Sequence, residues 1–105
     1  MATAILAQGA FVPSMPTWAL YLDNHVGIDI PLSAAGRPFT IAGRVLDSGN
    51  NVVREFAETG VNEPVFRKSL PPLSPGAYRL SVTIIDRGGR FVVLDRFPPL
   101  TAPER

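Results

Sequence analysis

The sequence predicts an all-β protein, an antiparallel β-sandwich of about seven to eight strands. Stretches that alternate apolar and polar residues recur along the chain, as half-buried strands do. Eleven prolines and nine glycines in 105 residues supply turn signals roughly every 8–12 residues. No stretch places apolar residues at helical spacing over three turns, so we expect almost no helix.

The chain begins with a segment that we expect to be an extended arm, residues 1–16. Pro13 and Pro16 prevent regular ladder pairing in its second half. Two alternating stretches follow, residues 17–23 and 26–32, and each is predicted to be a strand.

Two hairpins are predicted in the remainder of the chain. Residues 39–47 and 52–57 form the first, followed by a polar loop over residues 58–63 and a weaker strand over 64–70. The second joins residues 78–84 to 91–97 through a turn rich in glycine. The predicted organisation is therefore an arm (1–16), a sandwich domain (17–98) and a C-terminal tail (99–105).

Composition narrows the classes of function. Ten basic and nine acidic residues give a net charge of +1, too small to indicate binding to nucleic acid or to an anionic membrane. Absence of cysteine excludes disulfides and thiolate metal sites. No apolar run approaches the ~20 residues of a membrane span. The N-terminus lacks the basic residues of a signal peptide, so we expect no signal peptide.

Candidate catalytic and metal-ligating residues are few. The single histidine, His25, excludes a multi-histidine metal site within one chain. Asp23, Asn24, His25 and Asp29 include hard ligands for Ca²⁺, but a solvated polar turn is the favoured interpretation. We therefore expect no catalytic residue, no metal and no cofactor.

Three further features have simple structural explanations. Asp86 and Asp95 are expected to be charges near strand ends, and Gly88-Gly89 a turn without a following helix to bind phosphate. Trp18 and Tyr21 are three positions apart, an odd offset, and so face opposite sides of a strand. A shared sugar-binding platform is disfavoured, and Trp18 is expected in the core.

Residues 73–78 (LSPGAY) resemble a tyrosine corner. In immunoglobulin-like sandwiches, a tyrosine near the start of the penultimate strand donates its hydroxyl to upstream backbone. The resemblance implies that Leu73, Gly76 and Tyr78 form a structural corner in an immunoglobulin-like fold. The cysteine pair of antibody domains is absent.

A second resemblance covers residues 36–97. The order of GRPFTI, DSG, LSPGAY and DRGG is similar to that of small sandwich modules in tailed-phage virions. Such modules occur in baseplate scaffolds, where they usually continue into a fibre or stalk, and as head decoration proteins. Because this sequence ends at Arg105, decoration or cementing of a shell, or a small tail accessory, is the favoured expectation.

We therefore expect a non-enzymatic structural virion protein, made in the host cytoplasm, that binds other virion subunits or copies of itself as a homo-oligomer. Nine of the ten basic residues are arginines, which either an interface or a base-composition bias of the source genome would explain. The arm carries apolar side chains that we expect to dock on a neighbouring subunit: Ile5, Leu6, Phe11, Val12 and Met15. The alternative is a carbohydrate- or receptor-binding module on the same scaffold.

Overall fold

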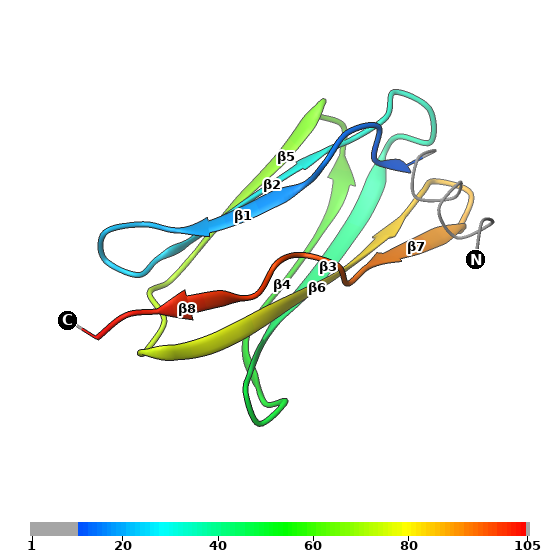
Figure 1. Cartoon of the computed structure of the whole chain (residues 1–105). Coiled ribbons are helices and arrows are strands. Elements are labelled where there is room, and N and C mark those ends of the chain that lie inside the picture. The colour runs from blue at the N-terminus through cyan, green and yellow to red at the C-terminus, as the bar shows by residue number, and fades with distance from the viewer. Residues whose placement is uncertain (1–10, 105) are drawn as a thin grey trace.

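Two antiparallel sheets pack face to face in the computed structural model, which describes residues 11–104 (Figure 1). The three-stranded sheet has the order β1-β2-β5, and these strands are β1 (Thr17–Leu20), β2 (Val26–Pro31) and β5 (Val65–Leu70). The five-stranded sheet has the order β4-β3-β6-β7, with β8 also on β6. Its strands are β3 (Phe39–Asp47), β4 (Val52–Val61), β6 (Gly76–Ile85), β7 (Phe91–Leu94) and β8 (Leu100–Ala102). The predicted all-β sandwich is confirmed.

The apolar alternation of the strands builds the core between the sheets. Ile28 and Ile30 of β2 lie inward from one sheet, and Ile41 of β3 and Val82 of β6 from the other; all four are 0% exposed. Their polar neighbours in sequence face solvent, as a two-residue period requires. Burial of each large apolar side chain contributes roughly 1.5–3 kcal/mol relative to exposure.

The strand order is immunoglobulin-like. β1, β2 and β5 form one sheet, and β3, β6 and β7 form the core of the other. The fourth strand, β4, pairs with β3 at the edge of the five-stranded sheet. β7 and β8 lie end to end along the same partner, β6, so together they act as one interrupted last strand (Figure 1).

The segment between β7 and β8 is fixed by contacts with core residues. Leu94 pairs with Val82 and Leu100 with Tyr78, so the last strand carries two more residues than its partner over this interval. Phe97 turns inward against Trp18, with ring centroids 6.4 Å apart. The Trp18 indole N–H donates to the Pro98 carbonyl at 2.6 Å.

Two boundaries differ from the sequence prediction. Residues 100–102, expected in a tail, form β8, because the chain re-enters the ladder of β6 after Pro98-Pro99. β4 continues through the predicted polar loop as far as Val61, which is buried and pairs with Phe39. The polar residues that suggested a loop lie on an edge strand instead, where one of them, Glu58, forms an ion pair with Lys68 of β5 at 2.9 Å.

Candidate interaction surfaces

The predicted arm residues divide between the core and the surface. Phe11 and Val12 are buried in the protein's own core, at 6% and 8% exposure, and the Phe11 ring lies 6.0 Å from that of Phe39. The Ser33 N–H donates to the Phe11 carbonyl at 2.9 Å. The expectation that Phe11 and Val12 dock on a neighbouring subunit is therefore wrong, because their side chains close the end of their own sandwich.

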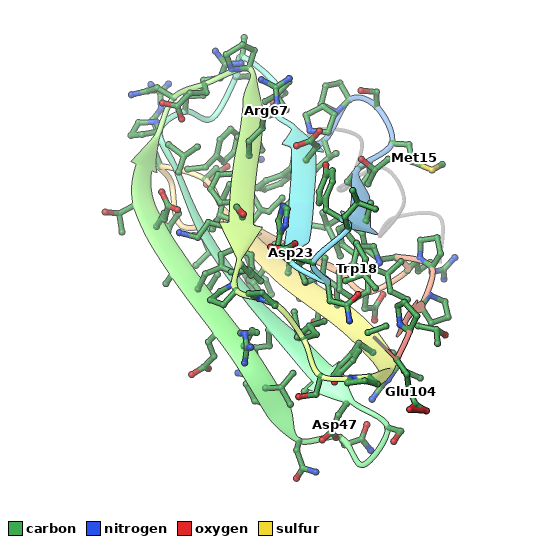
Figure 2. The ribbon with its side chains drawn as sticks, turned by 90° about the vertical axis from the view of Figure 1, so that its left-hand side faces the viewer. Met15, Trp18, Asp23, Asp47, Arg67 and Glu104 are labelled. Atoms are coloured by element: carbon green, nitrogen blue, oxygen red, sulfur yellow. The ribbon has the colours of Figure 1, made fainter. Side chains whose placement is uncertain are left out.

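The other three arm residues have different outcomes. Met15 is 81% exposed, and Figure 2 shows its side chain directed away from the sheets. Ile5 and Leu6 lie outside the described residues. Met15 therefore stays available for contact with a partner.

Tyr78 lies at the start of β6 with the geometry expected of a corner. Its hydroxyl donates to the Ser74 carbonyl at 2.6 Å, and Leu73 beside it is 4% exposed. Gly76 has φ 150°, a conformation that side-chain-bearing residues rarely adopt. This group fixes the connection from β5 to β6, and its polar atoms are used within the protein.

The polar turn between β1 and β2 is a structural tie. Asn24 is 3% exposed, and its amide donates to the carbonyls of Leu73 and Pro103 at 3.4 and 3.2 Å. Asp23 accepts the His25 N–H at 3.0 Å and also contacts His25 Nδ1. These bonds from the His25 side chain and backbone hold the pKa of Asp23 below its usual value. Across residues 11–104 no three acidic, histidine or cysteine side chains cluster closely enough to hold a metal ion.

Two hairpin turns share an aspartate cap that the sequence analysis missed. Asp47 accepts the N–H groups of Gly49 and Asn51, each at 2.9 Å. Asp86 accepts those of Gly88 and Arg90, also at 2.9 Å. The shared spacing, Asp followed by Gly two residues later, was the sequence signal for these caps.

The caps also shift the carboxyl pKa values. Backbone and side-chain hydrogen bonds from Asn51 hold the pKa of Asp47 below its usual value. Burial opposes ionisation of Asp86, but hydrogen bonds from Arg90 and Gly88 outweigh it and lower its pKa. Asp86 therefore lies at the end of β6, as expected, but it is a buried turn cap, which the sequence analysis did not predict.

The outer face of the five-stranded sheet, which points away from the three-stranded sheet, is organised in rows across the strands. One row pairs Thr40, Ile85 and Phe91. The next row runs Ala57, Ala42, Thr83 and Val93, and a third runs Glu55, Arg44 and Ser81. Successive rows are about 7 Å apart.

This outer face carries a ridge beside a hollow. Phe91 is 63% exposed and Val93 41%, and with half-buried Ile85 they form the apolar ridge at the β6–β7 edge. Next to it is an open hollow of about 660 Å³ with Ala42 and Thr83 on its floor. Arg44 and Glu55, directly opposite each other on β3 and β4, line the same hollow, which continues past them to Leu46.

A second surface lies on the outer face of the three-stranded sheet around Tyr21. The Tyr21 ring is 54% exposed, stacks on His25 at a centroid distance of 4.6 Å, and lies over Gly27. A Cβ at position 27 would stand 2.5 Å from the ring, so a larger residue there would displace the ring from this position. Arg67, which Figure 2 places at the end of β5 away from Asp47, pairs with Asp29 at 3.7 Å. These residues line an open hollow of about 300 Å³.

No family model and no curated protein matches the sequence. Among the described residues, no helix has the length and apolar character needed to cross a membrane.

Proposed function

We propose that this chain is a non-enzymatic structural subunit that packs into a larger assembly through the outer face of its five-stranded sheet. The observation that carries the proposal is the apolar ridge beside the hollow. Phe91 exposes 63% of its surface next to Val93 and Ile85 on a well-paired sheet. Contiguous exposed apolar side chains of this kind mark protein interaction sites, and burial of an aromatic ring is a frequent energetic centre of such contacts.

The assembly that we propose is a tailed-phage virion, in which the chain is a head decoration or tail accessory protein. The support is the resemblance of residues 36–97 to small sandwich modules of such particles. A sandwich whose sheet face is already formed suits that role, because little conformational entropy is lost when a preformed surface docks.

Fractionation of particles tests this proposal. Purified virions from the source of the sequence should contain the chain in a fixed ratio to the major shell or tail protein. The variant Phe91→Asp should fold normally but be lost from the particles, whereas Tyr21→Ala, on the opposite face, should be retained. A chain that is absent from washed particles would contradict the proposal.

A carbohydrate- or receptor-binding module is the second candidate, and the Tyr21 surface favours it. An exposed ring held in place by His25 and Gly27 offers an apolar face, while Asp29 and Arg67 nearby offer acceptors and donors. A hollow of about 300 Å³ lies at the lower end of the range for ligand sites.

Titration with glycosides separates this candidate from the first. Amide resonances of Gly27 and Ser69 should shift with a methyl glycoside of glucose, galactose or mannose if the Tyr21 surface binds sugar, and Tyr21→Ala should abolish the shifts. Phe91→Asp should leave them unchanged. Absence of shifts with all three sugars would contradict this second candidate.

A further inference from the structure

We infer that the partner on the outer face of the five-stranded sheet is a second copy of this chain, related by a two-fold axis that lies in the interface. This inference rests on the proposed function, since it names the occupant of the same surface. Each copy would place its Phe91 ring in the hollow of the other copy. The two contacts would be identical, as an isologous interface requires.

Self-complementary shape is the first argument. A two-fold interface needs a projection and a matching recess on the same surface, and this face carries both. Phe91 projects from β7, while the hollow has the small side chains of Ala42, Ala57 and Thr83 in the adjacent row. Phe91 and Ala42 are one row and two strands apart, roughly 12 Å. An in-plane axis midway between these two positions exchanges them.

Charge is the second argument. The hollow is lined by one arginine and one glutamate, Arg44 and Glu55, which face each other directly across β3 and β4. The two charges of this pair cancel, so two copies do not repel each other there. The chain as a whole has a net charge of only +1, so long-range repulsion between copies is weak.

The pattern also matches interfaces in general. Well-packed interfaces place apolar and aromatic residues at the centre and charged residues at a hydrated rim. With the Phe91 ring over Ala42 of the partner, the ridge and the alanine row form the centre, and Arg44 and Glu55 lie beside it, one row further along the strands. The Tyr21 surface lies on the other sheet and remains free in this arrangement.

Sedimentation equilibrium of the purified chain tests the inference. The wild type should show a concentration-dependent species of twice the chain mass. Phe91→Asp, which removes the projecting ring, and Ala42→Lys, which fills the hollow, should each weaken self-association by about 30-fold or more. Tyr21→Ala is the matched control on the opposite sheet and should associate like the wild type. Far-ultraviolet circular dichroism checks that each variant folds.

A mixture of the two variants supplies the decisive measurement. In a mixed pair, the carboxylate introduced by F91D meets the amine introduced by A42K, while the other contact keeps its native Phe91 and native hollow. An equimolar mixture should therefore recover dimer although each variant alone is monomeric. Recovery is not expected if the substitutions act by damaging the fold.

Two results would overturn the inference: a wild-type chain that stays monomeric up to millimolar concentration, or a dimer that survives both substitutions. Neither result decides the proposed function. If Phe91→Asp is lost from particles while the wild type is monomeric in solution, the face binds a different subunit and only the self-docking is wrong.

Discussion

The hydroxyl of Tyr78 joins a core side chain to the loop that precedes its strand. Its ring is 6% exposed, and its hydroxyl donates to the Ser74 carbonyl at 2.6 Å. Tyr78→Phe keeps the ring but leaves that carbonyl without its donor, so we expect a loss of about 1 kcal/mol in the free energy of unfolding. Urea denaturation measures it. Tyr21→Phe, at an exposed ring, is the control, and an equal loss in both variants would show that the corner bond contributes nothing specific.

Asn24 and Asn50 allow a matched comparison of a buried tie with an exposed turn. Both have φ 64°, a conformation that glycine adopts without strain. Only Asn24 has a buried amide, which donates to the carbonyls of Leu73 and Pro103. Asn24→Gly should therefore destabilise the fold by about 1–3 kcal/mol, and Asn50→Gly by much less.

Chemical denaturation of the two glycine variants gives this difference directly. Limited proteolysis adds a local measure, since the Asn24 tie holds the segment around Pro103. We expect faster cleavage near the C-terminus in Asn24→Gly than in Asn50→Gly. Similar stability and similar cleavage of the two variants would show that the hydrogen bonds of the Asn24 amide do not stabilise the fold.

At the scale of elements, the capped hairpins make the fold sensitive to acid. The pKa values of Asp23, Asp47 and Asp86 all lie below the usual 3.8 in the folded protein. A carboxyl whose pKa is lower when folded than when unfolded stabilises the fold at pH values above the unfolded pKa. That contribution is lost as the pH falls through the folded pKa.

We therefore expect the urea midpoint to be steady from pH 7 to about 5 and to fall steeply below about pH 4. In the double variant Asp47→Asn and Asp86→Asn, each cap keeps an acceptor oxygen but cannot ionise, so the fall should be shallower. Asp29→Asn, on the outer face of the three-stranded sheet, is the control. A double variant with the wild-type pH dependence would show that the turn caps do not cause it.

At the scale of the whole molecule, residues before the first strand complete the core. Phe11 packs against Phe39 with 6% of its surface exposed, and the adjacent Ser33 bonds to its backbone. We expect Phe11→Ala to lower the free energy of unfolding by about 3 kcal/mol, through lost transfer energy and a cavity. Met15→Ala, at 81% exposure, should change it by less than about 0.5 kcal/mol. Thermal unfolding, monitored by circular dichroism, measures the stability of both variants. A small loss of stability in Phe11→Ala would show that this segment is an external arm and not part of the core.

Local pattern by itself determined the strands whose two faces meet different environments. The alternation in β2, β3 and β6 predicted these strands to within two residues of their observed bounds, because one face meets the core and the other meets water. The sequence of residues 73–78 likewise indicated a corner, since a Pro-Gly bend before a tyrosine restricts the backbone locally.

Tertiary structure alone decided the features that depend on distant partners. In the sequence, Phe11 and Val12 belong to a segment that was predicted to be an arm. They are core residues because the sandwich is open near Phe39 and their side chains are buried there. β8 has no pattern of its own and exists because β6 is longer than β7 and offers unpaired ladder positions beyond it. The ridge and hollow of the outer face likewise arise from the register of four strands, which brings Phe91, Thr83, Ala42 and Ala57 together from separate parts of the chain. Pairing across strands is set by the packing of the whole sandwich, so a pattern with a period of two residues cannot reveal it.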